Sequence, residues 1–170
     1  MVFHNVVADH TIVANFTLMP PSWLAVWRFH SVKVVGSYLW TADPNEKANI
    51  QANLRKSWTF EGQAFAINTN NPKNNATQWR FRNKKLGTYF YTSDPNEKAN
   101  LQANLSATWV FEGPVWNVSR DAVGTAPVWR FRCLKNPTFL WTSDPNEKLT
   151  IQMKLQKTYV LEGIAYYVGQ

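Results

Sequence analysis

A chain of 170 residues with 45% hydrophobic content is long enough to bury one core, and no apolar run is long enough for a membrane-spanning helix. Its single cysteine, Cys133, excludes an internal disulfide framework, and the start of the chain lacks the pattern of a secretory signal peptide. We therefore expect a single domain over residues 1–170, located in the cytoplasm or secreted without a leader. Two features need an explanation: a net charge of +7 and nine Trp residues.

The first segment in chain order, residues 1–22, precedes a repeated pattern. Within it, residues 11–16 (TIVANF) have the apolar and β-branched composition of a strand. We expect this N-terminal strand to close the molecule by pairing with the last repeat, so that no sheet edge stays exposed.

The rest of the chain contains one sequence unit three times, over residues 23–70, 71–120 and 121–170. Each unit has an aromatic-Arg-Phe block, an aromatic block ending in Thr, an Asp-Pro-Asn-Glu-Lys block and a block ending in Glu-Gly. Because these blocks recur in the same order at nearly the same spacing, we interpret them as an internal repeat.

Four short strands are predicted in each unit. In the first unit they are residues 27–29, 38–41, 58–61 and, after a Glu-Gly pair, 64–67, which are rich in aromatic or alternating residues. Four strands in each of three units predict a mainly β fold with three short helices and pseudo-threefold symmetry. We favour a three-bladed β-propeller-like ring. The alternative is a β-trefoil, in which a helix inside each unit would be unusual.

The Asp-Pro-Asn-Glu-Lys block predicts the start of a helix. Asp43 suits the N-cap, Pro44 the first helical position and Glu46 the third, which together form a capping box. Ile50 and Leu54 lie four residues apart and would seat the helix on the sheet. A ligand-facing role is the alternative for the repeated asparagines of the block, Asn45, Asn96 and Asn146.

Nothing in the sequence predicts catalysis. The three histidines lie within the first 30 residues and do not recur, and no metal-binding or phosphate-binding motif is present. We therefore expect no enzyme activity, no metal site and no cofactor. One Arg–Glu ion pair per unit is expected from the repeated residues Arg28, Arg80 and Arg130 with Glu61, Glu112 and Glu162.

The order of the four blocks resembles a family of short aromatic repeats. These repeats occur, often in threes, in bacterial secreted and cell-wall proteins and in some fungal proteins, and the resemblance covers residues 27–168. The family is largely of unknown function, and the resemblance implies cell-surface or glycan binding. Its members often have His where this chain has Tyr38, Tyr89 and Phe139, so a role tied to that imidazole does not carry over.

Repeated aromatic residues without catalytic groups favour carbohydrate binding. Aromatic rings stack on the apolar face of a sugar, and Arg, Glu or Asn side chains bind its hydroxyls. We predict up to three equivalent shallow sites on a lectin-like protein, which would bind a multivalent glycan surface. The first stacking candidates are Trp40, Tyr91 and Trp141, on the strand face of Tyr38, Tyr89 and Phe139, with the repeated Arg and Glu residues as polar partners. A second aromatic set is Phe65, Trp116 and Tyr166.

Two alternative functions stay open. The first is protein interaction or inhibition through a loop such as residues 68–77. The second is nucleic-acid binding, which a pI near 9.6 and many aromatic residues would suit. Nucleic acid is the less favoured partner, because the basic excess lies at positions that differ between the units and is typical of a solvated surface.

Overall fold

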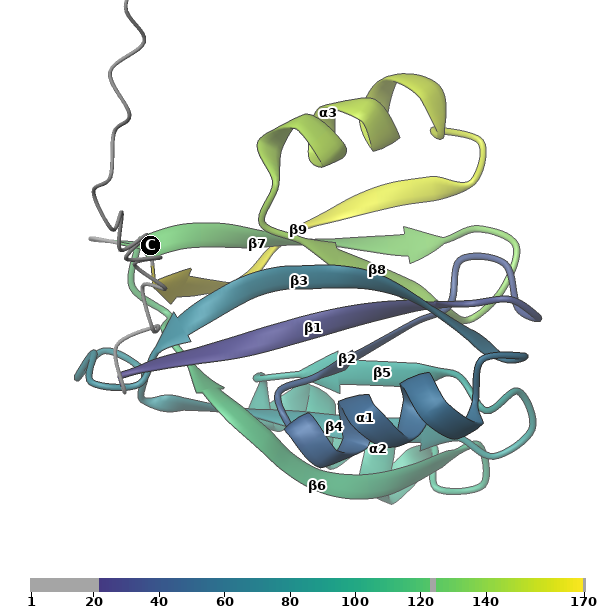
Figure 1. The fold of residues 1–170 in the computed structure, drawn as a ribbon, viewed down its shortest axis with the longest axis horizontal. Coiled ribbons are helices and arrows are strands. Elements are labelled where there is room, and N and C mark those ends of the chain that lie inside the picture. The colour runs from purple at the N-terminus through teal and green to yellow at the C-terminus, as the bar shows by residue number, and fades with distance from the viewer. Residues whose placement is uncertain (1–21, 123–124, 170) are drawn as a thin grey trace, which may run out of the picture.

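The computed structural model describes residues 22–122 and 125–169, so the strand expected within residues 1–22 lies outside the described part. Each repeat folds into its own three-stranded antiparallel sheet with one helix (Figure 1). The first sheet contains β1 (Trp23–Ser31), β2 (Tyr38–Thr41) and β3 (Trp58–Asn68), with α1 (Pro44–Asn53). The second contains β4 (Ala76–Asn83), β5 (Tyr89–Thr92) and β6 (Trp109–Val118), with α2 (Pro95–Asn104). The third contains β7 (Thr125–Cys133), β8 (Phe139–Thr142) and β9 (Tyr159–Gly169), with α3 (Pro145–Lys154).

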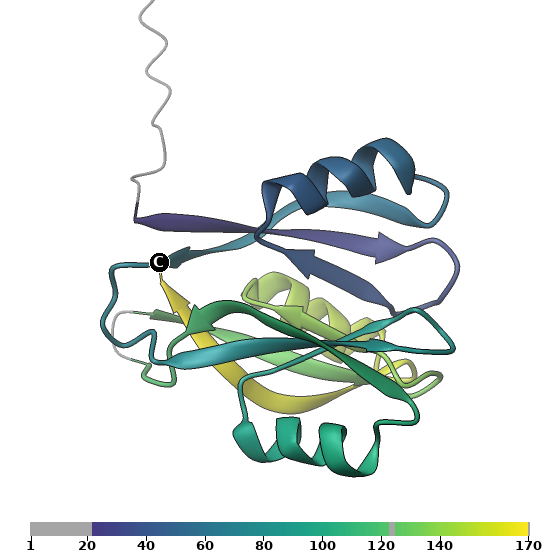
Figure 2. The ribbon, with the colours of Figure 1, turned by 90° about the horizontal axis from the view of Figure 1, so that it is seen from below.

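In the described residues, the sheets and helices confirm a mainly β fold with three helices and pseudo-threefold symmetry. In every sheet the first strand of the repeat lies in the middle, as in the order β2-β1-β3. One three-stranded sheet per repeat is consistent with the propeller-like ring that the sequence favoured. The helices lie on the outer faces of the sheets, away from the centre where the three repeats meet (Figure 2).

The expectation of four strands per repeat is wrong, because the last two expected strands form one long strand. In β3 the Glu-Gly pair forms a β-bulge: Phe29 pairs with Phe60 and Arg28 pairs with Gly62, so Glu61 has no partner on β1. Gly62 has a φ of +106°, a conformation that only glycine adopts without strain. A second irregularity follows at Ala64, and both recur in β6 and β9.

The helices begin as predicted, but the capping box is not formed. The Asp43 carboxylate accepts a hydrogen bond from the Asn45 N–H at 2.8 Å, and Pro44 occupies the first turn. Glu46, however, binds an arginine of the next repeat, and the Asp43 N–H donates to the Thr41 hydroxyl, so Asp43 is an N-cap without the reciprocal bond of a capping box. The expected pair of anchoring residues is also half correct. Ile50 is buried, whereas Leu54 follows the end of the helix and is exposed.

The centre of the molecule is a triangle of aromatic rings. The rings of Trp40, Tyr91 and Trp141 meet edge to face, with centroids 5.2 to 5.7 Å apart. The Tyr91 hydroxyl accepts from the Trp40 N–H and donates to the Trp40 carbonyl oxygen. A second layer of Phe65, Trp116 and Tyr166 packs beside this triangle. Four of the nine Trp residues are therefore buried in the shared core of the three repeats: Trp40, Trp109, Trp116 and Trp141.

Candidate functional site: three pockets between the repeats

Each repeated arginine joins two repeats. Arg28 lies on β1, and its guanidinium contacts Glu61 of the β3 bulge at 2.5 Å. Its other side contacts Glu147 of α3, in the third repeat, at 2.8 Å. The arginine therefore pairs within its own sheet, as the sequence predicted, and also binds a carboxylate of another repeat, which sequence reasoning missed.

The same pattern recurs at all three interfaces, so three separate Glu–Arg–Glu sets, which we call the ion-pair ring, link the repeats in a closed cycle. Arg80 contacts Glu46 of α1 at 2.9 Å and Glu112 of its own sheet at 2.8 Å. In the third repeat, Arg130 contacts Glu97 of α2 at 2.9 Å and Glu162 of its own sheet at 2.7 Å. Each arginine therefore binds the helix of the preceding repeat, and Arg28 closes the ring by binding the last one.

The arginines of the ring are half-buried. Burial by itself lowers the pKa of Arg28, but the hydrogen bonds and charges of Glu147 and Glu61 outweigh burial and raise the pKa overall. Burial likewise acts to lower the pKa of Arg80, while Tyr91 and the carboxylates of Glu46 and Glu112 raise it overall. The guanidinium groups of Arg28 and Arg80 are therefore fixed cations.

A pocket lies at each of the three interfaces between repeats, where the start of one helix faces the bulged strand of the next repeat. The α2–β9 pocket has a volume of about 350 Å³, the α1–β6 pocket about 340 Å³ and the α3–β3 pocket about 200 Å³. All three share the Thr that ends a strand, the Asp N-cap, the helix Glu and the Arg of the ion-pair ring. In the α1–β6 pocket these residues are Thr41, Asp43, Glu46 and Arg80.

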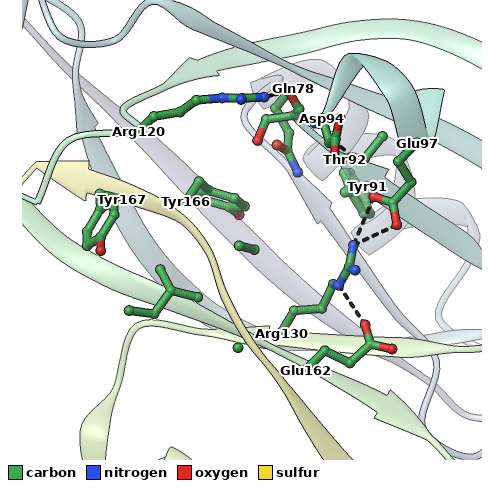
Figure 3. A pocket seen from close by; sticks show the side chains of 14 residues that line it. Gln78, Tyr91, Thr92, Asp94, Glu97, Arg120, Arg130, Glu162, Tyr166 and Tyr167 are labelled. Carbon is green, nitrogen blue, oxygen red and sulfur yellow. Dashed lines mark hydrogen bonds and ion pairs between the residues drawn. The ribbon is translucent and has the colours of Figure 1, made fainter. Parts of the chain in front are cut away.

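The α2–β9 pocket differs from the other two in its polar side chains (Figure 3). Gln78 lines it at the position that Val26 and Val128 occupy in the other repeats. The Gln78 side chain is fully buried, and neither amide atom has a hydrogen-bond partner among the residues that the structure describes. Arg120 reaches the rim from the end of β6 and donates a hydrogen bond to the Ser93 carbonyl oxygen at 2.5 Å.

The first stacking candidates, Trp40, Tyr91 and Trp141, are a wrong prediction. Each ring is at most 2% exposed in the central triangle, so none presents an open face to a sugar, and only Tyr91 of the three borders a pocket, the α2–β9 pocket. The period-two alternation correctly placed them on one strand face, but that face points to the centre of the molecule. Leu39 lies on the opposite face, where it packs with Ile50 of the helix.

The rings expected beside them are also unavailable as open platforms. Tyr38, Tyr89 and Phe139 are half-buried, and the arginine of the same repeat lies 5.4 to 5.8 Å above each ring. Burial, as the largest cause, raises the pKa of the Tyr38 and Tyr89 hydroxyls. These rings therefore support the ion-pair ring, through cation–π contacts, instead of facing solvent.

The predicted polar residues do lie at the pockets. Arg28, Arg80 and Arg130 each line one, as do Glu61 and Glu162, whereas Glu112 binds Arg80 but does not line the α1–β6 pocket. From the second aromatic set, Trp116 and Tyr166 contribute to pocket walls. The sequence missed the helix carboxylates, which the capping-box interpretation assigned to the cap, and the Thr at the end of the strand before each helix. In the α2–β9 pocket it also missed Gln78 and Arg120.

Within residues 22–122 and 125–169, no group of three or more His, Cys, Asp or Glu residues is arranged to hold a metal ion. No helix in this part of the chain is long and apolar enough to cross a membrane.

Comparison with known proteins identifies a family without an assigned activity. A family model described as "Domain of unknown function (DUF5648)" matches residues 12–106, which is more than half of the chain, and the chain belongs to this family. The match includes the whole first sheet and, from the second, β4, β5 and α2. Neither the curated proteins nor the solved structures contain a match. The resemblance to short bacterial and fungal repeats stays a prediction.

Proposed function

We propose that this member of a family of unknown function binds carbohydrate in the pockets between its repeats and performs no chemistry on it. The observation that supports this proposal is the recurrence of one polar set, Thr, Asp, Glu and Arg, at all three interfaces. Carboxylate and guanidinium groups present several acceptors and donors in fixed planes, which suits a ligand with neighbouring hydroxyls.

Two of the pockets are the better candidates. Small-molecule sites have volumes of about 300–1,000 Å³. The α2–β9 and α1–β6 pockets reach that range, and aromatic rings contribute to their walls at Tyr166 and Trp116. The α3–β3 pocket is smaller and has no aromatic lining. We therefore propose two working sites, fewer than the three that the sequence predicted.

Two sites on one rigid body would strengthen binding to a multivalent glycan surface, because the second contact becomes intramolecular. Protein interaction or inhibition through residues 68–77 is the first alternative function, and nucleic-acid binding is the second. A glycan array, run beside a salt-titrated oligonucleotide-binding assay, distinguishes carbohydrate binding from nucleic-acid binding.

The number of sites is testable by removing one pocket carboxylate at a time. Serine is as good an N-cap as aspartate, so Asp43→Ser and Asp94→Ser remove a carboxylate from a large pocket while keeping the helix cap. With the best glycan from the array, calorimetry is expected to show about two sites in the parent chain and one in each variant.

The matched control is Asp144→Ser, which makes the same change in the small α3–β3 pocket and is expected to leave the stoichiometry unchanged. Absence of any glycan binding, or the same stoichiometry in all three variants, would reject the proposed function.

A further inference from the structure

One end of the molecule is built from six short connections. They are the three hairpin loops, residues 32–37, 84–88 and 134–138, and the three helix-to-strand turns, residues 54–57, 105–108 and 155–158. Figures 1 and 2 show all of the hairpin loops at the same end, where the helices also finish. A backbone hydrogen bond of 2.8 to 2.9 Å joins each loop to the turn beside it, as from the Val32 N–H to the Ser57 carbonyl oxygen. We call this surface the loop end.

The loop end carries a concentrated positive charge. Eight exposed cations lie on its loops and turns or on the last residue of α3: Lys33, Arg55, Lys56, Lys84, Lys85, Lys135, Lys154 and Lys157. Every acidic residue in the described part of the chain lies outside these segments. Those remaining described residues hold ten cations and ten carboxylates, so the positive charge of the described part originates at the loop end; Asp9, outside the described residues, brings the whole chain to +7. The basic excess is thus gathered on one surface, where the sequence had indicated a general solvated exterior.

Exposed aliphatic side chains lie among these cations. Val32, Val35 and Leu134 in the hairpin loops are 51 to 64% exposed. The turns add one exposed leucine each: Leu54, Leu105 and Leu155. The six connections contain no Phe, Tyr or Trp. An exposed aliphatic surface among basic residues is unusual on a soluble domain and suits a partner that is both apolar and anionic.

We propose that the loop end docks onto the surface of an anionic lipid bilayer. The lysines would lie at the level of acidic headgroups, and the valines and leucines would enter the interfacial region below them. Nucleic acid shares the negative charge, but single-stranded recognition uses aromatic stacking, and the loop end offers no ring. The pockets are at the helix N-termini, about 15 Å from the helix ends at the bilayer, because a ten-residue helix has that length. They would therefore stay open to glycans.

Vesicle sedimentation tests the charge requirement. The parent chain is expected to bind phosphatidylcholine vesicles that contain phosphatidylserine and to dissociate from them at high salt. It is not expected to bind vesicles of pure phosphatidylcholine. Each basic residue near an anionic surface raises partitioning about fivefold, so Lys84→Glu with Lys85→Glu is expected to weaken binding more than about tenfold. The matched control, Lys73→Glu, lies in the loop between β3 and β4, away from the loop end, and is expected to leave binding nearly unchanged.

A polarity-sensitive fluorophore tests insertion. Val35→Cys places a label in the loop end, and Lys73→Cys places one away from it, while the native Cys133 is buried and protected from labelling. On adding acidic vesicles, the emission from position 35 is expected to shift to the blue and that from position 73 to stay constant. No vesicle binding, equal binding by the Lys84/Lys85 variant, or binding to an oligonucleotide in place of vesicles would overturn the proposal. The Asp94→Ser variant, which is expected to lose one glycan site, is expected to bind vesicles as the parent chain does. Failure of the vesicle proposal can therefore be distinguished from failure of the glycan proposal.

Discussion

At the scale of single residues, Gln78 is the clearest departure from the repeat. Its side chain lies in the core at the position of Val26 and Val128, and its amide has no partner among the described residues. A buried amide without hydrogen bonds costs about 1–3 kcal/mol. A sequence search could flag Gln78 as the odd member of its set, but burial and the pocket wall become visible only once the three sheets are placed together.

Gln78→Val is therefore expected to raise the free energy of unfolding by about 1–2 kcal/mol, measured by urea denaturation. The reciprocal change, Val128→Gln, is expected to lower it by a similar amount, because it buries an amide in the third repeat. Unchanged or reduced stability of the Gln78→Val variant would mean that the amide is satisfied in solution.

At the scale of elements, the sequence correctly predicted the features that depend only on neighbouring residues. Asp43 and Pro44 start the helix as expected, since capping needs only neighbouring residues. The Glu-Gly pair was misinterpreted as the boundary between two strands. Whether a glycine ends a strand or forms a bulge depends on its partner strand, here through the pairing of Arg28 with Gly62, and the sequence alone does not contain that register. The bulge also turns Glu61 toward Arg28, so the same misinterpretation hid the geometry of the pocket.

The bulge glycines are expected to resist substitution even where space is available. At Gly113 φ is +120° and an added Cβ would meet nothing within 4 Å, so Gly113→Ala tests backbone strain alone. We expect it to lower the free energy of unfolding by about 1–3 kcal/mol in urea titrations. The control is Gly87→Asn, at a φ of +66° that asparagine tolerates, and its cost is expected to be clearly smaller. Equal costs would show that the bulge can relax.

At the scale of the whole molecule, the core depends on all three repeats at once. The repeated blocks predicted the pseudo-threefold symmetry, because symmetry is visible as recurrence in one sequence. They did not predict which aromatic rings point to the axis. A strand face at an interface and a strand face in solvent have the same alternation, so Trp40, Tyr91 and Trp141 resembled binding residues although they form the centre.

The buried tyrosines predict a loss of stability at alkaline pH. Burial, the largest cause, raises the pKa of Tyr91, Tyr159 and Tyr166 above the ordinary value of 10.0. Above pH 10 the unfolded chain releases these protons while the folded chain keeps them. Stability that is fully present below pH 10 is therefore lost as the pH rises, by about 1.4 kcal/mol per pH unit for each tyrosine.

Tyr166→Phe is expected to make that decline shallower by the contribution of one tyrosine, and phenylalanine already occupies the equivalent position at Phe65. Urea midpoints measured at several pH values above 10 check the slope. The same slope in parent and variant would show that the pKa of Tyr166 does not differ between the folded and the unfolded chain.

The closed ring of arginine and glutamate pairs has a consequence for biosynthesis. Arg28 is made early, yet its partner Glu147 lies 119 residues later in the chain. While the ribosome is still producing the third repeat, β1, β3 and Glu61 have already been made, but the Arg28 guanidinium lacks its second carboxylate and the Trp40 ring lacks its neighbour Trp141. The first repeat is made earliest, but its contacts to the third repeat can form only at the end of translation.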